Sequence, residues 1–415
     1  MLQSFYFFFN AALSIISSFL PVYLESQGFS GTQIANIMAL DSIIAIVGIS
    51  ILWGYISDKS QKPALVLQIL ALGTALSFIP ILLGGSTYSW VFFGYFIFGL
   101  FSCPIGGIAD SLGVIKAREK GIDFGKIRVW ASIGWFSATV VIGFVLAARG
   151  TKIEVKSFSD VATVFTAMFE GKGINWNDPI VIMFVIGGFV LTFLSALGFK
   201  NVKKGESKKS EKPKISDLKL IFKNNYFLVF LLVVVCHMLS LKSFYFVYGI
   251  HVKNLQMSPT ILSIAFSVAT LAEILVLTMF GKLRKFLSLE NLILIAVGVS
   301  IFRWILLANT ETVTVLLLGQ LLNAASSGIF IAAAVSLVAE AAESRLLVTY
   351  QQVYYYAMFI GNLIGTYASG FIYETSNKNA IPVFYMMACV EVLGVLFVLL
   401  SMKMRKKSDS KVANV

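Results

Sequence analysis

The feature that most constrains this chain is a succession of apolar runs, each about 20 residues long, along nearly its whole length. An apolar helix of about 20 residues crosses the hydrocarbon core of a bilayer. The runs do not alternate between apolar and polar residues, as the roughly 10-residue strands of a membrane barrel would. The sequence therefore predicts membrane-spanning helices, at 4–24, 32–56, 63–83, 89–114, 125–148, 178–199, 225–250, 258–281, 290–308, 312–339, 346–372 and 381–402.

The composition excludes a water-soluble protein. Only 13% of the 415 residues are charged and 58% are hydrophobic, whereas soluble domains carry about 25% charged residues. In lipid every backbone N–H and C=O needs a partner within the protein, which a helix supplies. The predicted fold class is an all-α membrane protein with twelve transmembrane helices.

The distribution of Lys and Arg predicts the orientation. If the N-terminus is cytoplasmic, loops and tails on that side hold 24 of the 33 basic residues, and the opposite side holds 6. Cytoplasmic loops carry an excess of Lys and Arg, so both termini are predicted to be cytoplasmic. The net charge of +12 then reflects membrane orientation, and no nucleic-acid partner is expected.

A Lys-rich polar segment divides the chain into two halves. Residues 200–224 are poor in aromatic residues until their end and are typical of a flexible linker. The predicted domains are an N-terminal six-helix bundle (1–199), this linker, a C-terminal six-helix bundle (225–402) and a cytoplasmic tail (403–415). Two six-helix halves are typical of transporters that bind substrate near the bilayer midplane.

At least seven charged residues fall well inside the predicted spans, where each calls for a partner or a hydrated cavity: Asp41, Asp110, Arg128, Lys242, Glu273, Arg303 and Glu391. Asp110 is expected to pair with Arg128, and Glu273 with Arg303. Each pair either serves function or only locks helices together.

Two of these residues, and one histidine, have other interpretations. Lys242 either snorkels or pairs with Asp41. Glu391, in the last helix, is expected near another helix or a lipid headgroup, and His237 is expected to be buried and hydrogen-bonded.

Neutral polar residues share helix faces in two C-terminal spans. Gln320, Asn323 and Ser327 follow helical spacing, and so do Gln352, Tyr355, Asn362 and Thr366. These faces line either a hydrated cavity or hydrogen-bonded helix contacts.

Nothing in the sequence indicates catalysis or a cofactor. The chain has two histidines, and its three cysteines, expected to be small buried hydrophobic residues, are far apart: Cys103, Cys236 and Cys389. No metal-ligand spacing, phosphate-binding loop or catalytic triad is present. We expect no enzyme activity, no metal and no cofactor.

The segment from Gly54 to Lys59 reads Gly-Tyr-Ile-Ser-Asp-Lys and follows the second predicted span. It resembles the signature that the major facilitator superfamily carries between its second and third helices. The resemblance implies alternating access between two six-helix bundles, with Gly54, Asp58 and Lys59 controlling opening.

Residues 123–135, which read DFGKIRVWASIGW, resemble the fifth-helix entry of the lactose permease and 3-phenylpropionate permease group. The resemblance implies that Asp110, Arg128 and Trp135 bind substrate. Charged side chains with an aromatic platform suit a polyol or a carboxylate.

The C-terminal half resembles the same group at Ala272-Glu273, Phe302-Arg303-Trp304, Gln320-Leu-Leu-Asn323 and Gln352-Val-Tyr354. The resemblance implies a proton site at Glu273 and Arg303, and Asp41 is a further candidate. Asn323 and Gln352 are candidate substrate ligands. The chain departs from these relatives at Asn323, where they carry a histidine, and at Ala325, where lactose permease carries a carboxylate.

The resulting hypothesis is proton-coupled symport of a small polar solute, a sugar or an aromatic carboxylate, by alternating access. The expected partners are this solute, the proton and the lipid bilayer, and the protein is expected to be a monomer in a bacterial inner membrane. One alternative is a proton-driven exporter of amphipathic compounds. Another, from a different class, is a membrane-embedded enzyme or receptor.

Overall fold

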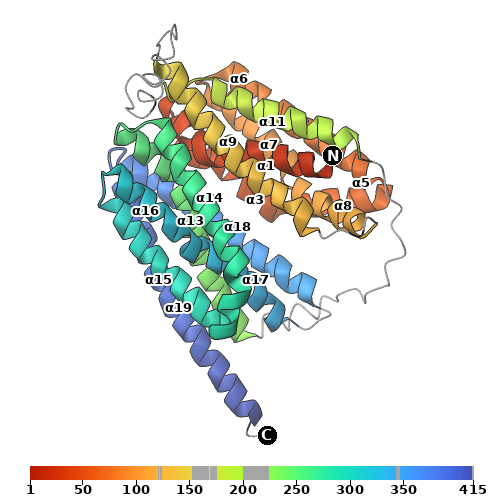
Figure 1. The fold of residues 1–415 in the computed structure, drawn as a ribbon, viewed down its shortest axis with the longest axis vertical. Helices are drawn as coiled ribbons and strands as arrows, with labels where there is room; N and C mark the ends of the chain where they lie inside the picture. The colour runs from red at the N-terminus through yellow and green to blue at the C-terminus, as the bar shows by residue number, and fades with distance from the viewer. Residues whose placement is uncertain are drawn as a thin grey trace. The chain divides into compact units, whose positions relative to one another are not determined.

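The computed structural model describes residues 1–119, 121, 124–151, 168, 175–199, 224–342 and 346–413. Helices make up nearly all of these residues (Figure 1), and no strand occurs among them. All but the last residue of the predicted linker 200–224 lies outside the described residues. The all-α prediction is confirmed for the described chain.

The N-terminal half contains long helices and also shorter helices that are separated by breaks. They are α1 (Leu2–Ser26), α2 (Gly31–Met38), α3 (Leu40–Val47), α4 (Ile49–Ser60), α5 (Pro63–Ser77), α6 (Ile79–Gly84), α7 (Tyr88–Ser102), α8 (Ile105–Glu119), α9 (Gly125–Thr151) and α11 (Ile180–Leu197).

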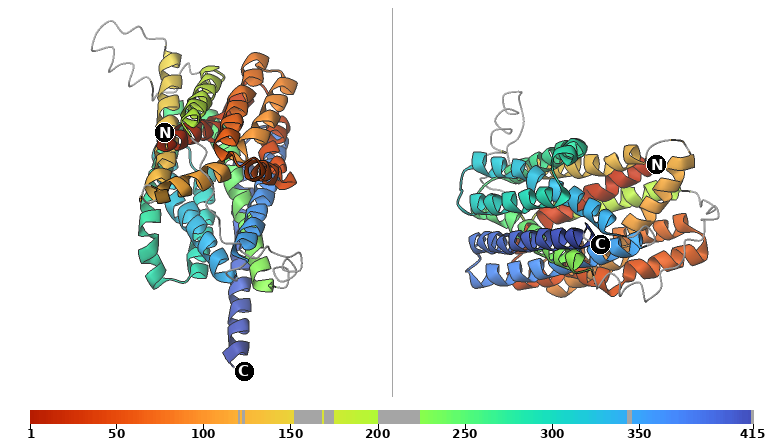
Figure 2. Two further views of the ribbon diagram at one scale, coloured as in Figure 1. Left: turned by 90° about the vertical axis from the view of Figure 1, so that its right-hand side faces the viewer. Right: turned by 90° about the horizontal axis from the view of Figure 1, so that it is seen from below.

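The C-terminal half is built mainly from long helices, and Figure 2 shows the last of them running without a break to the C-terminus. They are α13 (Asn225–Asn254), α14 (Pro259–Phe286), α15 (Leu289–Ala308), α16 (Val313–Asn323), the π-helix η1 (Ala324–Gly328), α17 (Ile329–Ala341), α18 (Leu347–Thr375) and α19 (Ile381–Ala413).

Ten helices among the described residues are long and apolar enough to cross a membrane, or eleven if the bent segment Gly31–Ser57 counts as one span. The remaining predicted span coincides with α18, which is 29 residues long but does not meet the same hydropathy criterion. The chain is therefore a multi-pass membrane protein, and the count of twelve stays a prediction.

Local sequence explains where the helices begin and break. The Ser30 hydroxyl accepts a hydrogen bond from the Gln33 backbone N–H, and the Gln33 side-chain oxygen accepts one from the Ser30 backbone N–H, which makes a capping box at the start of α2. Gly48 has a φ of +91°, a left-handed conformation that favours glycine, and it separates α3 from α4 with a 54° bend. Pro80, in the first turn of α6, removes a backbone donor where α5 ends.

The chain divides into two compact units. Unit 1 comprises Met1–Gly205, Tyr245–Ser267 and Ser369–Asn379, and unit 2 comprises Glu206–Phe244, Val268–Ala368 and Ala380–Val415. The predicted division into two six-helix bundles follows the order of the helices, and it stays a prediction.

In unit 1, α1 packs along both α9 and α11. Glycine permits the first contact, because a Cβ at Gly134 would lie 2.1 Å from the Phe7 carbonyl oxygen. In unit 2, a Cβ at Gly365 of α18 would lie 2.4 Å from the Leu239 carbonyl oxygen of α13. Small residues thus let helix backbones approach closely, as is typical of membrane proteins.

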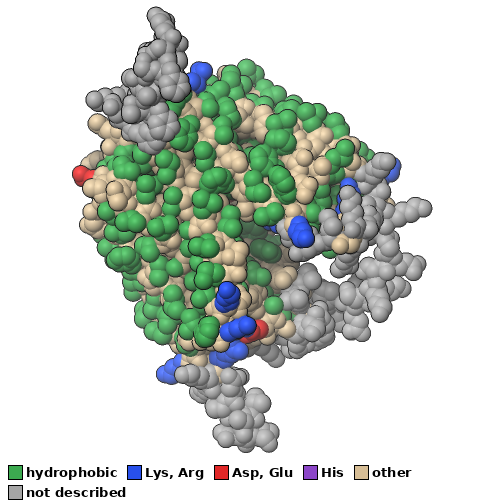
Figure 3. Space-filling model, in the orientation of Figure 1, with side chains coloured by type: hydrophobic (Ala, Val, Ile, Leu, Met, Phe, Trp, Pro, Cys, Tyr) green, Lys and Arg blue, Asp and Glu red, His purple; other side chains and the backbone are tan. Residues whose placement is uncertain are grey.

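Figure 3 shows hydrophobic side chains over most of the described surface on one face of the molecule. Large apolar residues such as Leu83, Leu275 and Phe371 are 62–78% exposed, as expected for helices that face lipid. The cysteine prediction is confirmed for Cys236 but wrong for Cys389, which is exposed, because an apolar thiol needs no burial on a lipid-facing helix.

Candidate functional site

Unit 1 brings the predicted pair Asp110 and Arg128 into direct contact. The Arg128 guanidinium forms an ion pair with one carboxylate oxygen of Asp110. Tyr6 of α1 donates its hydroxyl to the other oxygen at 2.6 Å, and its ring lies 5.6 Å from the centre of the guanidinium. Three helices, α1, α8 and α9, thus supply one polar cluster.

This cluster is accessible on one side. The side chains of Arg128 and Asp110 are 52% and 37% exposed, whereas Tyr6 is only 3% exposed. Trp135 follows Arg128 by seven residues and lies on the same face of α9. The predicted contact of acid and base is confirmed, whereas the place of Trp135 beside them rests on helical spacing. Among the described residues the ion pair uses one guanidinium nitrogen of Arg128, so the others can donate to a further partner.

Unit 2 holds its arginine differently. Arg303 of α15 is completely buried and donates to four groups: the Gly319 carbonyl (3.1 Å), Gln320 (2.8 Å), Asn323 (2.8 Å) and Ser326 (3.3 Å). Its guanidinium also lies 4.6 Å from the ring centres of Phe244 and Trp304. A buried charge needs such compensation.

Asn323 connects this arginine to the predicted proton site. Its side-chain oxygen accepts from Arg303, and its Nδ2 donates to Glu273 of α14 at 3.4 Å. Because an amide cannot titrate, Asn323 holds a fixed polarity between the guanidinium and the carboxylate. Glu273 itself is partly exposed, so its carboxylate is not sealed in.

The π-helix η1 begins immediately after Asn323. A Cβ at Gly328, the last residue of η1, would lie 3.3 Å from Glu273 Cγ, so η1 packs against α14 beside the carboxylate. Single π-turns within α-helices are rare and are frequent at functional sites. Ser326, within η1, also accepts from Arg303, whereas Ser327 was the residue predicted for this face.

Two other predicted site residues, Asp41 and Gln352, lie on α3 and α18. Asp41 is in the first turn of α3 and accepts from the backbone and hydroxyl of Ser42 at 2.6 and 3.1 Å. Lys242 belongs to unit 2 while Asp41 belongs to unit 1, so their pairing stays a prediction. Gln352 is exposed on α18.

The predicted gating segment lies at the C-terminal end of α4. Lys59 is exposed, with its Nζ 5.8 Å from the Tyr55 ring centre, and a Cβ at Gly54 would meet no atom within 4 Å. The side chain of Asp58 lies outside the described residues.

Sequence reasoning missed a buried pair in unit 2. His237 Nδ1 lies 2.9 Å from Glu391 Oε1, and the two side chains are 1% and 0% exposed. The His237 ring stacks on Phe330 at 3.8 Å. The prediction of a buried, hydrogen-bonded histidine is confirmed. The expectation that Glu391 lies near another helix or a lipid headgroup is confirmed for the first alternative, because α19 directs it to His237 of α13.

A second missed cluster lies within unit 1 and joins segments far apart in sequence. Glu25, at the end of α1, forms an ion pair with Lys253 of α13 and accepts from the Tyr373 hydroxyl at 3.4 Å. Glu374 of α18 accepts from the Gly31 amide at 2.7 Å. These contacts connect the segments 245–267 and 369–379 to α1 and α2. The charge of Glu25 was the one sequence signal for them.

No group of three or more His, Cys, Asp or Glu residues that could hold a metal occurs among the described residues. The two arginine clusters offer charged hydrogen-bonding groups.

The sequence matches the MFS_1-like family over residues 1–386. It is 23% identical to the uncharacterized transporter YwbF of Bacillus subtilis, covering 98% of this chain and 94% of that protein. It is also 23% identical to a probable 3-phenylpropionic acid transporter of Escherichia coli, with 93% of each chain covered. A maltose permease of Geobacillus stearothermophilus is 30% identical over 34% of this chain and 35% of its own length.

Solved structures with a similar fold include the nucleoside transporter NupG, with a TM-score of 0.76 and 16% identity over 97% of this chain and 98% of that one. A POT family transporter in complex with a thioalcohol-conjugated peptide aligns with a TM-score of 0.69 and 12% identity, covering 97% and 95% of the two chains. Together with the apolar helices, the family match shows that this chain belongs to the MFS_1-like family and is a transporter of the major facilitator type.

Proposed function

We propose that the protein is a proton-coupled symporter of a small polar solute, and that the clusters around Arg128 and Arg303 have different roles. The Asp110–Arg128–Tyr6 cluster binds the solute, and Glu273 carries the proton. The observation that carries the proposal is the Asn323 bridge between Arg303 and Glu273.

The bridge supports proton transfer at Glu273 for an electrostatic reason. Arg303 is permanently charged and fully buried, and all three of its guanidinium nitrogens already donate. It is therefore a positioning residue that orients Asn323. Glu273 has one amide donor at 3.4 Å and remains partly exposed, so its carboxylate can exchange a proton without breaking the Arg303 network.

The solute class follows from the chemistry of the unit 1 cluster. Arg128 offers a planar set of donors to a carboxylate or to paired hydroxyls, and Asp110 accepts from hydroxyls. The names of the relatives fit this class, since they include a 3-phenylpropionic acid transporter and a maltose permease. We propose a sugar or an aromatic carboxylate as the solute. Charged groups of this kind favour such a solute over an amphipathic cargo for export.

The membrane topology completes the proposal. We infer that α18 is the twelfth span, because its 29 residues would extend about 43 Å at 1.5 Å per residue. Both termini would be cytoplasmic in a bacterial inner membrane, as the excess of basic residues in the corresponding loops favours. The protein would act as a monomer.

The experiment uses the full-length protein in proteoliposomes that contain a pH-sensitive dye. A panel of sugars, nucleosides and aromatic carboxylates is added, and solute entry and internal acidification are followed together. We expect one class to enter with acidification and its accumulation to stop when a protonophore is added. Accumulation that persists undiminished with the protonophore would exclude proton coupling.

The variant Glu273→Gln separates transport from coupling. It should lose proton-driven accumulation while still exchanging labelled for unlabelled solute, because exchange needs no net proton movement. Glu340→Gln is the matched control, since Glu340 is a unit 2 carboxylate paired with Arg284 on the exposed surface. Full accumulation by Glu273→Gln would assign the proton to another group.

A further inference from the structure

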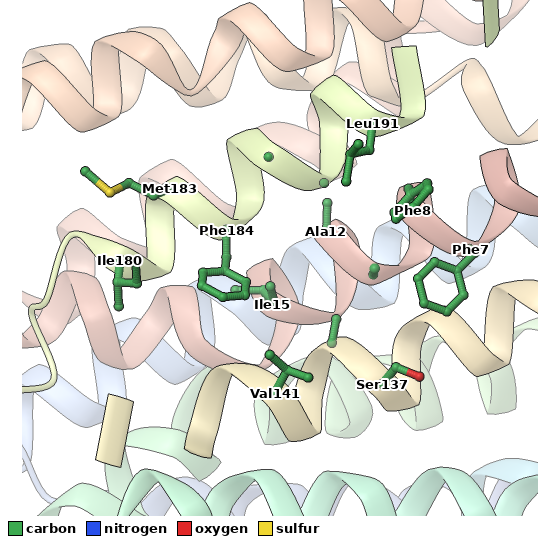
Figure 4. A pocket seen from close by; sticks show the side chains of 14 residues that line it. Phe7, Phe8, Ala12, Ile15, Ser137, Val141, Ile180, Met183, Phe184 and Leu191 are labelled. Atoms are coloured by element: carbon green, nitrogen blue, oxygen red, sulfur yellow. The ribbon is translucent and has the colours of Figure 1, made fainter. Parts of the chain in front are cut away.

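A groove runs between α9 and α11 in unit 1, with α1 as its floor. Both helices pack along α1 but hardly touch one another, which leaves a cavity of about 480 Å³. Figure 4 shows Phe184, Ile15 and Val141 near the middle of the cavity, with Phe7 and Phe8 toward one end and Ile180 and Met183 toward the other. The polar clusters described above lie outside this cavity's lining.

Small residues on the facing helices create the groove. Gly188 of α11 packs on Ala12, and a Cβ added at Gly188 would lie 3.0 Å from the Ala12 Cβ. This contact brings α11 close to α1, the floor of the groove. A Cβ at Gly187, which also lines the groove, would meet no atom within 4 Å. The space beside Gly187 is therefore free, and a side chain at this position would enter it.

The residues that line the groove favour a hydrocarbon ligand because nearly all of them are apolar. Ser137 is the one polar side chain among the fourteen residues that line the groove. Water in such a space would lack the two to four polar partners it needs, and an unfilled space would forfeit dispersion contacts. At roughly 30 Å³ for a water-sized group, the groove has room for about sixteen methylene-sized groups, which is the scale of one acyl chain.

A basic residue lies near one end of this groove. Arg149 follows Val141 by eight residues on α9 and is therefore on the same helix face. Its Nε donates to Asp178 at 2.6 Å, two residues before Ile180, which lines the groove. Among the described residues, Arg149 forms this ion pair through Nε, and its side chain is 57% exposed. Within that part of the chain its other nitrogens can donate to a phosphate.

We propose that this groove is a binding site for one acyl chain of a membrane phospholipid whose phosphate contacts Arg149. The chain is a multi-pass membrane protein, so hydrocarbon surrounds the groove at this depth. Because lipid tails are as apolar as the lining, filling alone gives little preference for one lipid over another. The contact with Arg149 provides the preference for a phosphate.

The test measures lipid binding to the purified full-length protein by native mass spectrometry. Three probes separate the parts of the ligand: dioleoylphosphatidylglycerol, dioleoylglycerol with the same chains but no phosphate, and glycerol 3-phosphate without chains. We expect saturable binding of the phospholipid, binding of dioleoylglycerol weaker by about tenfold (one charge-assisted contact), and none of glycerol 3-phosphate. Equal binding of the first two, or binding of glycerol 3-phosphate in place of the lipid, would overturn the proposal.

Variants locate the site. Gly187→Phe should weaken phospholipid binding by about tenfold or more because the ring fills the groove. Gly298→Phe on α15 is the matched control, since a Cβ there also meets no atom within 4 Å, and it should bind as the wild type does. Unchanged binding by Gly187→Phe, or an equal loss in both variants, would contradict the site.

Two further variants keep the test decisive. Val141→Phe narrows the groove from its α9 wall at a position that is 45% exposed, and it should repeat the loss if Gly187→Phe does not fold. Arg149→Gln should reduce phospholipid binding to the dioleoylglycerol level, and an unchanged preference for the phosphate would remove Arg149 from the site.

Discussion

Arg128 and Arg303 lie in opposite environments, although each belongs to a predicted acid–base pair. Arg128 contacts its carboxylate directly and is 52% exposed. Arg303 is completely buried and reaches Glu273 through the neutral amide of Asn323.

The difference separates two uses of the same side chain. An exposed ion pair contributes only about 0–1 kcal/mol to stability, so Arg128 can exchange its partner for a solute at small cost. A buried guanidinium that donates to four groups cannot, because each acceptor left without its donor would cost about 1–3 kcal/mol. Arg303 therefore holds structure, and Arg128 is the arginine suited to binding.

The largest expected effect is that of Arg303→Met. It removes the donors to Gly319, Gln320, Asn323 and Ser326, and leaves these groups unsatisfied in the core. We expect a loss of about 3–5 kcal/mol in the free energy of unfolding, seen as a lower melting temperature and loss of the monodisperse peak in detergent. Arg284→Met, which breaks an exposed pair with Glu340, should leave both nearly unchanged. Equal melting temperatures for the two variants would show that burial does not distinguish the arginines.

The second effect is on binding. Arg128→Ala should weaken solute affinity by about 10- to 100-fold, corresponding to about 1.5–3 kcal/mol for charge-assisted hydrogen bonds, and leave the melting temperature nearly unchanged. Lys126→Ala, at an exposed position on the same turn of α9, controls for loss of positive charge. Affinity is measured by calorimetry with the solute found in the transport screen. Wild-type affinity in Arg128→Ala would move the binding site elsewhere.

The third effect tests the amide bridge. Asn323→Ala should lower proton-driven uptake by about tenfold, or about 1.4 kcal/mol, and adding Glu273→Gln should then cost little more. Gln320→Ala also removes an acceptor of Arg303, but Gln320 is not the residue that donates to Glu273. Uptake in the Gln320→Ala background should therefore remain fully sensitive to Glu273→Gln. Additive losses at Asn323 and Glu273 would mean that the two residues act independently.

The sequence predicted a direct contact correctly where two conditions held: a charge inside an apolar run, and a partner close along the chain. Glu273 and Arg303, expected to pair but farther apart along the chain, are instead bridged by Asn323. Asp110 and Arg128 are 18 residues apart and met both conditions, and their pairing is confirmed. Their roles, and those of Glu273 and Gln352, stay predictions.

The missed contacts have physical reasons. His237 and Glu391 are 154 residues apart, and nothing in helical periodicity relates the rotation of α13 to that of α19. Ser326 follows Gly319 by seven residues and so shares the helix face that meets Arg303, whereas Ser327 was predicted for that face. The η1 sequence Ala-Ala-Ser-Ser-Gly carries no signal for a π-helix. The apolar pattern predicted α18 as a span. Its polar residues keep its mean hydropathy below the value that the other long helices reach.

The smallest expected effect concerns the third member of the unit 1 cluster. Tyr6→Phe removes the 2.6 Å hydrogen bond to Asp110 but keeps the ring near Arg128. A single hydrogen bond contributes about 0.5–1.5 kcal/mol, so solute affinity should fall by about 2- to 12-fold, since 1.4 kcal/mol corresponds to tenfold. Tyr23→Phe is the matched control, because Tyr23 is an equally buried α1 tyrosine whose hydroxyl accepts from Gln27 at 3.0 Å. If both variants lower the affinity alike, the loss comes from a general perturbation of α1; if only Tyr6→Phe does, the hydroxyl orients the carboxylate that receives the solute.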